Sequence, residues 1–115
     1  MCIYEGVGEI WIKSKKYTLY VGLNDKDTKT QKIDTIEAYK IIENLLVNKV
    51  DGGTIFEANG VYKHEDGTVV IEKTLRVEIM FATDTQIKEI VEYLKIILNQ
   101  ESIAVQKEEI TSELM

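Results

Sequence analysis

Arg76 is the only arginine in this 115-residue chain, and it lies in a stretch whose residues alternate between polar and apolar. A guanidinium group binds a phosphate or a carboxylate through two parallel hydrogen bonds, so this arginine is a candidate for ligand recognition. The alternative is that Arg76 only pairs with a nearby glutamate, Glu72 or Glu78, as an ordinary charge pair of a sheet. The sequence leaves both interpretations open.

Other side chains suited to ligand binding are expected to share an open sheet face with Arg76. The strand patterns place there Thr18, Tyr20, Tyr62, His64, Glu72, Thr74, Arg76, Glu78, Ala104 and Gln106. The ring of Tyr20 or Tyr62 would stack on a planar ligand while the arginine holds its anionic group. The predicted ligand-binding residues are therefore Arg76, Tyr20, Tyr62, His64, Glu72, Glu78 and Gln106.

His64 is the only histidine, and histidine is the side chain that titrates near neutral pH without special help. As a general base it would need an orienting carboxylate, and Glu72 is expected to lie across the Asp66-Gly67 hairpin from it. No G-x-S-x-G serine motif and no reactive cysteine completes such a site. The sequence favours an ordinary strand or hairpin histidine and predicts no catalytic residue.

The loop that opens with Asn24, Asp25, Lys26, Asp27 and Thr28 has the acidic spacing of a calcium loop's first half. It lacks the central glycine and the terminal glutamate of such loops, and lysines intervene. Cys2 is the only cysteine, so one chain forms neither a disulfide nor a thiolate metal cluster. We expect no metal and no cofactor.

The elements that must position these residues follow from hydrophobic periodicity. The line Thr68 to Phe81 buries one face through Leu75, Val77, Ile79 and Phe81, and its length favours a central strand. Asp34 and Thr83 are expected N-caps, with capping-box partners at Glu37 and Gln86. The other expected strands are Glu9 to Lys13, Tyr17 to Leu23, Ser102 to Gln106, and Thr54 to His64 with a one-residue slip at Asn59-Gly60.

The order strand, helix, strand, strand, helix, strand predicts an α+β, ferredoxin-like βαββαβ fold. Its four-stranded antiparallel sheet would carry both helices on one face, with an extra N-terminal edge strand in front. The expected organisation is an N-terminal extension or edge strand over residues 1–16, one ferredoxin-like domain over 17–106, and a charged tail over 107–115. No linker or repeat divides the chain.

The charge balance limits the expected partners. Twenty acidic and 14 basic residues give a net charge of −6, which lacks the basic footprint of a nucleic-acid or anionic-membrane surface. No signal peptide or membrane-length apolar run is present, so we expect a cytoplasmic protein. Exposed aromatic residues on a sheet face usually mark contacts, which predicts a homo-oligomer through the open face or the N-terminal strand.

Several short motifs occur in a characteristic order: Thr18-Leu19-Tyr20-Val21-Gly22, Asp51-Gly52-Gly53-Thr54, Ala58-Asn59-Gly60-Val61-Tyr62, Asp66-Gly67, Glu72 and Gln100-Glu101-Ser102-Ile103. Together they resemble a family of small uncharacterised bacterial and phage proteins. The chain departs from the family pattern because it lacks a tryptophan near the first helix, and its first sixteen residues lie outside the match. The resemblance implies the ferredoxin-like fold and no particular activity.

These observations favour a non-enzymatic binding protein, of the kind that phages or mobile elements use as accessory, anti-defence proteins. Such a protein would capture a small ligand, such as a nucleotide signal, or block a protein partner. One alternative is a small dimeric ferredoxin-like enzyme that uses His64. Another is a purely structural homo-oligomer.

Overall fold

The computed structural model describes the backbone of residues 2–6 and 9–115, and side chains from residue 11 onward. Its elements are β1 (Cys2–Gly6), β2 (Glu9–Gly22), α1 (Thr35–Lys49), β3 (Thr54–Lys63), β4 (Val69–Met80), α2 (Asp84–Ile97) and β5 (Ala104–Ser112). This order is the predicted βαββαβ arrangement with one additional N-terminal strand. The predicted fold class is confirmed.

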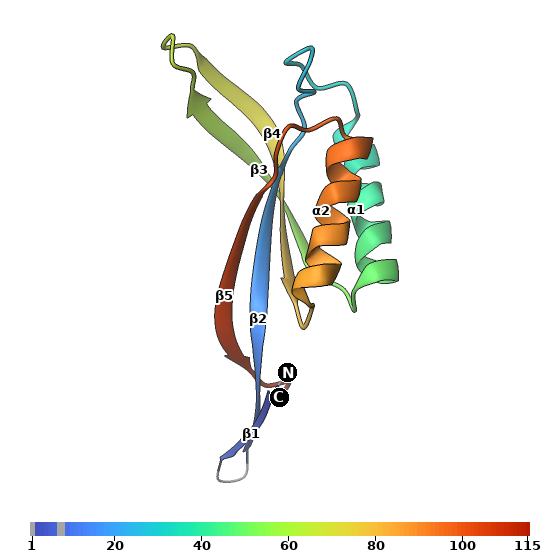
Figure 1. Ribbon diagram of the computed structural model, residues 1–115, viewed down its shortest axis with the longest axis vertical. Coiled ribbons are helices and arrows are strands. Elements are labelled where there is room, and N and C mark those ends of the chain that lie inside the picture. Colours follow the sequence, from blue (N-terminus) through green and yellow to red (C-terminus); the bar gives the residue numbers. More distant parts are fainter. Residues whose placement is uncertain (1, 7–8) are drawn as a thin grey trace.

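The sheet is antiparallel throughout and has β2 and β4 at its centre (Figure 1). β5 pairs with β2 on one side, and β3 pairs with β4 on the other. β1 pairs with the beginning of β2, where Cys2 lies opposite Lys13. It uses the same edge of β2 that pairs with β4 further along the strand. Both helices cover one face and leave the other open.

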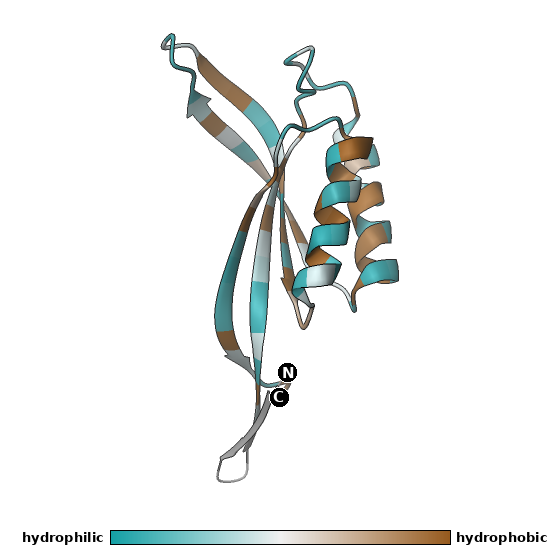
Figure 2. Cartoon of the chain, in the orientation of Figure 1, coloured by the Kyte–Doolittle hydropathy of each residue, from teal (hydrophilic) through white to brown (hydrophobic). Residues whose placement is uncertain are grey.

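The core lies between this sheet and the helices. Alternate residues of the central strands are fully buried, among them Leu19, Val21, Leu75 and Val77, and they meet the apolar faces of α1 and α2. Figure 2 shows apolar and polar residues alternating around both helices. Burying one such aliphatic side chain contributes about 1.5–3 kcal/mol to the free energy of folding. The packing of this face against the helices therefore fixes where the residues of the open face lie.

The two helices begin differently. The predicted capping box of α2 is confirmed, because the Thr83 hydroxyl accepts from the Gln86 N–H at 3.2 Å and the Gln86 side chain accepts from the Thr83 N–H at 2.9 Å. Asp34 is the N-cap of α1, but its side chain makes no capping hydrogen bond, so the predicted box with Glu37 is wrong. Instead, the amide of Gln31, which precedes the helix, donates to the Thr35 hydroxyl at 3.0 Å and so holds the first residue of α1.

Three strands differ from the expected ones. β2 is one strand of 14 residues that includes the polar Ser14 to Lys16, because β5 supplies backbone partners all along it. β5 accordingly continues past Gln106 to Ser112, into the expected tail. The slip at Asn59-Gly60 is wrong: β3 pairs with β4 without a break, and Gly60 is needed because a Cβ there would lie 2.8 Å from the Thr74 Oγ1.

The molecule is elongated, 56 by 30 by 23 Å, because two strand pairs extend past the helices (Figure 1). One of these strand pairs is the end of the β3–β4 hairpin. The hairpin turns at the predicted Glu65-Asp66-Gly67, where Gly67 has a φ of +92°. Three large apolar side chains of this hairpin, Val61, Val69 and Ile71, are more than half exposed. Its other face carries Tyr62 and leads into the candidate site.

Candidate functional site

A cavity of about 260 Å³ lies where three parts of the chain meet at one end of the sheet. The loop after β2 contributes Asn24, Asp25, Lys26 and Lys29. The β3–β4 hairpin contributes Tyr62, His64 and Glu72, and the connection from α2 to β5 contributes Gln100 to Ser102. We call this cavity the Glu72 pocket. It brings together an aromatic ring, the single histidine and groups of both charges.

The Glu72 carboxylate has a fixed position in this pocket. Its Oε2 accepts a hydrogen bond from the Asn24 backbone N–H at 3.0 Å. The carboxylate also lies directly over Gly22, where a Cβ would come within 2.6–2.8 Å of its three terminal atoms. Within the described part of the chain, Glu72 takes part in no ion pair. It is therefore a negative charge held in place without a cationic partner.

Tyr62 and His64 form the wall of the pocket on the hairpin side. Their rings meet edge to face, with centroids 5.4 Å apart and an interplanar angle of 85°. The His64 backbone closes the hairpin through the Thr68 carbonyl at 2.8 Å. Among the described residues, no hydrogen bond joins the His64 ring to Glu72, so the predicted orienting pair is not formed in this structure.

The loop Asn24 to Thr30 is fastened to the α2–β5 connection on the opposite wall. Asn99 Nδ2 donates to Asp25 Oδ2 and to Asp27 Oδ2, both at 2.9 Å, and the buried Gln100 amide donates to the Asn24 carbonyl at 2.6 Å. The Asn99 amide, with the backbone N–H groups of Thr28 and Asp27, lowers the pKa of Asp25 to about 2. The two acidic residues that resemble a calcium loop thus converge on an amide.

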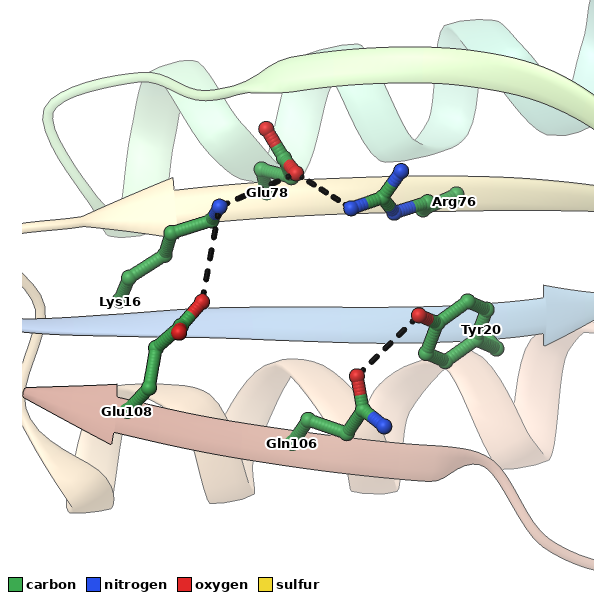
Figure 3. Close-up of polar contacts among 6 residues, drawn as sticks. All are labelled: Lys16, Tyr20, Arg76, Glu78, Gln106 and Glu108. Atoms are coloured by element: carbon green, nitrogen blue, oxygen red, sulfur yellow. Dashed lines mark hydrogen bonds and ion pairs between the residues drawn. The ribbon is translucent and has the colours of Figure 1, made fainter.

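The other predicted residues form a separate group on the open face, which we call the open-face network (Figure 3). Arg76 pairs with Glu78 at 2.7 Å, and Lys16 bridges Glu78 at 3.3 Å and Glu108 at 3.6 Å. The Arg76 guanidinium also lies 5.4 Å from the centroid of the Phe56 ring. Arg76 therefore makes the glutamate pairing that the sequence offered as its alternative role.

Tyr20 completes the open-face network by donating to the Gln106 Oε1 at 3.1 Å. Thr18 and Thr74 are buried although they belong to the open face. The predicted site thus divides into two parts. The Glu72 pocket contains Tyr62, His64 and Glu72, and the open-face network contains Arg76, Tyr20, Glu78 and Gln106.

Sequence reasoning missed several residues of both parts. Phe56, Lys26 and Lys29 are absent from the predicted ligand-binding residues, and the expected slip in β3 would turn Phe56 away from the open face. Asn99 is absent from them too, although asparagine tolerates the left-handed backbone that it adopts here, with a φ of 48°. An asparagine directly after a helix was the one signal available for that contact.

A third polar cluster lies at the other end of the sheet and ties β2, α2 and β5 together. The buried Tyr17 hydroxyl donates to Asp84 Oδ1, and Lys107 approaches both oxygens of the same carboxylate at 3.3 Å. Burial, followed by the Asp84 contact, raises the pKa of Tyr17 to about 12. The hydrogen bonds from Tyr17 and Lys107 lower the pKa of Asp84.

A larger cavity, of about 780 Å³, lies near this third cluster, between the lower ends of β2 and β5 and the residues that precede α2. Its charged lining residues are Lys13, Lys15 and Glu109, all on exposed strand positions. The smaller Glu72 pocket is the better candidate because a backbone N–H holds its carboxylate in position. It also joins that carboxylate to a ring pair within one cavity.

The described residues form neither a cluster of metal ligands nor a helix that could span a membrane. They contain no group of three or more histidine, cysteine, aspartate or glutamate side chains able to hold a metal ion. They also contain no helix with the length and apolar character that crossing a bilayer requires.

Fold and pocket together define a small ferredoxin-like α+β domain with a polar pocket at one end of its sheet. No family model and no curated protein matches the sequence. The fold does match a phage SAM lyase in complex with S-methyl-5'-thioadenosine, with a TM-score of 0.64 and 18% identity over 89% of this chain and 92% of the other.

A phage SAM lyase in the apo state also matches, with a TM-score of 0.62 and 19% identity over 88% of this chain and 86% of the other. At such identities the likeness shows a shared fold. It extends over nearly the whole chain.

Proposed function

We propose that this protein binds S-adenosylmethionine in the Glu72 pocket and cleaves it to S-methyl-5'-thioadenosine. Two considerations support the proposal: the fold shared with a phage SAM lyase that holds this thioadenosine, and the charge pattern of the pocket. Function is not inherited from a fold alone. The proposal therefore also needs support from the residues of the pocket.

The observation that carries the proposal is the unpaired carboxylate of Glu72, held by the Asn24 N–H and seated over Gly22. S-adenosylmethionine has a permanent positive charge on its sulfur, and a positioned carboxylate attracts such a charge more strongly in a partly desolvated site. Tyr62 offers an exposed ring beside this carboxylate, on which the adenine would stack. The sequence expectation of a captured nucleotide-like ligand is thereby narrowed to a sulfonium nucleoside.

The cleavage needs no cofactor or added reactant. An oxygen of the substrate's own carboxylate forms a bond to the carbon γ to that carboxyl group, while the bond from this carbon to sulfur breaks. The bonding pair stays on sulfur, which becomes the neutral thioether of S-methyl-5'-thioadenosine, and the remainder closes as a lactone. The protein's contribution is to hold the chain folded so that the two reacting atoms meet.

The test is to incubate the purified protein with S-adenosylmethionine and to follow thioadenosine release by chromatography. We expect product to accumulate with the wild type and to be strongly reduced with Glu72→Gln. Glu57→Gln is the control, because Glu57 is an exposed glutamate of β3 outside the pocket. Binding without product would replace the lyase by a capture protein, and neither binding nor product would refute the proposal.

A phage accessory role follows from the same proposal. Capture or cleavage of S-adenosylmethionine would deprive host enzymes that depend on this methyl donor. Expression of the protein in a bacterial host should then lower the cellular S-adenosylmethionine level, which mass spectrometry of extracts measures. Glu72→Gln should leave that level unchanged.

Self-association is a second part of the proposal, through the open sheet face or the N-terminal strand. The half-exposed Phe56 on the open face favours it, since exposed apolar patches on soluble proteins commonly mark contacts. Light scattering at micromolar concentration should give a mass above 13.2 kDa. A monomer mass would exclude both this assembly and the purely structural alternative.

A further inference from the structure

Two lysines of the loop after β2 line the Glu72 pocket. Lys26 and Lys29 both border the cavity that contains the Glu72 carboxylate. Within the described part of the chain, neither lysine belongs to an ion pair. One pocket thus joins two lysines, which make no ion pair, with three carboxylates, those of Asp25, Glu72 and Glu101, of which Asp25 accepts from the Asn99 amide.

The backbone that carries these lysines is held in place, unlike that of an ordinary surface turn. The Lys26 N–H donates to the Asn99 carbonyl at 3.0 Å, and the Lys29 N–H donates to the Asp25 carbonyl at 2.9 Å. Lys29 itself has a φ of 60°, a left-handed conformation that a non-glycine residue keeps only when its surroundings enforce it. The loop is therefore ordered before a ligand arrives.

Asn99 is the centre of this restraint. Its side-chain amide contacts Asp25 and Asp27, on either side of Lys26, while its backbone carbonyl accepts from Lys26 itself. Three contacts from one residue fix the position of the first lysine. An ordered loop loses less conformational entropy when a ligand binds. Asn99 therefore raises the affinity for the ligand without contacting it.

The charge pattern of the pocket matches one part of the proposed ligand. S-adenosylmethionine carries an amino-acid carboxylate as well as its sulfonium, whereas S-methyl-5'-thioadenosine has neither. We infer that Lys26 and Lys29 recognise the carboxylate of the ligand's amino-acid end, and that Asn99 is the residue that positions them. This inference rests on the proposed function, and it makes the pocket selective for an amino-acid nucleoside over a bare thionucleoside.

The first test uses S-adenosylhomocysteine, which keeps the carboxylate, lacks the sulfonium and is not cleaved by the proposed chemistry. In calorimetry, the double variant Lys26→Met with Lys29→Met should bind it about tenfold more weakly, because charged hydrogen bonds are lost. Binding of S-methyl-5'-thioadenosine should change less than about twofold. Lys32→Met is the matched control, since Lys32 is an exposed lysine close to the loop and outside the pocket lining.

The second test isolates positioning from direct contact. Asn99→Gly keeps the left-handed backbone but removes the amide, so it should weaken S-adenosylhomocysteine binding and leave thioadenosine binding nearly unchanged. Asn48→Ala is the control, because it removes a comparable exposed amide from α1. Alanine replaces the residue there because glycine within a helix would loosen it. Circular dichroism melts identify any loss that comes from unfolding.

The outcomes separate this inference from the proposal on which it rests. A wild type that binds neither nucleoside refutes both. A wild type that binds both, with lysine variants that lose both ligands equally or lose neither, refutes the carboxylate role alone. Lysine variants that behave as expected beside an unaffected Asn99→Gly would overturn the positioning role of Asn99.

Discussion

The Glu72 pocket and the open-face network use similar residues in opposite ways. In the open-face network, Glu78 has both Arg76 and Lys16 within 3.3 Å, so its charge is balanced inside the protein. In the Glu72 pocket, the carboxylate is held by a backbone N–H alone and has no cation within an ion-pair distance in the described residues. Charges that the fold leaves unbalanced are the ones available to a ligand.

The energetics of the open-face network support this division. Partly exposed ion pairs contribute only about 0–1 kcal/mol each, so these pairs do not explain the fold's stability. Two of the network residues, Glu78 and Gln106, lie on either side of the buried Thr18 in the strand register. A ligand that used the Arg76 Nη2 would compete with Glu78 for it, whereas no ion pair among the described residues competes for the Glu72 carboxylate.

The largest expected effect comes from neutralising the pocket carboxylate. Glu72→Gln keeps an oxygen that accepts from the Asn24 N–H, so the shape is retained while the charge is removed. Affinity for S-adenosylmethionine should fall about 100-fold, equal to roughly 2.7 kcal/mol, if the carboxylate faces the sulfonium. Competition against a fluorescent adenosine probe measures it.

The matching change in the open-face network is Glu78→Gln. Because Glu78 lies outside the pocket, affinity should change less than about twofold. S-adenosylhomocysteine supplies an internal control, since it has no sulfonium and its affinity should be nearly the same for Glu72→Gln and the wild type. Equal losses from both glutamate variants would contradict the division between the two regions.

A smaller effect is expected from the glycine beneath the carboxylate. In Gly22→Ala the new methyl group would lie 2.6 Å from Glu72 Oε1, so the carboxylate has to move. A side-chain end moves easily, so the unfolding free energy should change by less than about 1 kcal/mol. Ligand affinity should fall about tenfold, because the charge leaves its position.

Gly67→Ala provides the reverse case. Nothing lies within 4 Å of the added methyl group, but the φ of +92° is strained for alanine. The free energy of unfolding should fall while ligand affinity stays near the wild-type value, which urea unfolding and titration calorimetry together establish. If Gly22→Ala instead unfolded the protein without a specific loss of binding, the close approach would be structural only.

The fold could be predicted from the sequence because its signals are local and agree with one another. The alternation of Leu75, Val77 and Ile79 required a one-sided strand, and the Thr83 capping box placed the start of α2. The strand ends were less accessible. β5 extends past Gln106 because β2 offers it unpaired backbone groups, and such a partner is invisible in the residues of β5 themselves.

The site could be predicted only in part, since it depends on contacts between distant segments. Tyr62, His64 and Glu72 were found because they lie on one hairpin. Asn99 and Asp25 are 74 positions apart, and no periodicity in either segment points to the other. The sequence also could not decide between two partners for Arg76, because a choice between Glu72 and Glu78 depends on side-chain rotamers and neighbouring charges.

Replacing the network arginine should have a small effect. Arg76→Met removes the pair with Glu78 and the stacking on Phe56, and the unfolding free energy should fall by about 1 kcal/mol or less. Ligand affinity should remain within about twofold of the wild type. A large loss of affinity would return Arg76 to the ligand site, and a change in the light-scattering mass would assign the open face to assembly.

The smallest effect concerns pH and the cluster at the other end of the sheet. Tyr17→Phe removes the hydroxyl that donates to Asp84, so the melting temperature should fall by a few degrees near neutral pH without a change in ligand binding.

Asp84 has a lowered pKa, so its stabilisation is present above the ordinary carboxyl pKa and is lost as pH falls through the folded value. Tyr17 has a pKa raised to about 12, so its contribution is complete below pH 10 and is lost as pH rises through about 12. The difference in melting temperature between wild type and Tyr17→Phe should therefore be constant from about pH 5 to 9 and shrink on both sides. Equal melting temperatures of the two proteins at every pH would mean that the ring's packing, which both retain, rather than the hydrogen bond to Asp84, holds β2 to α2.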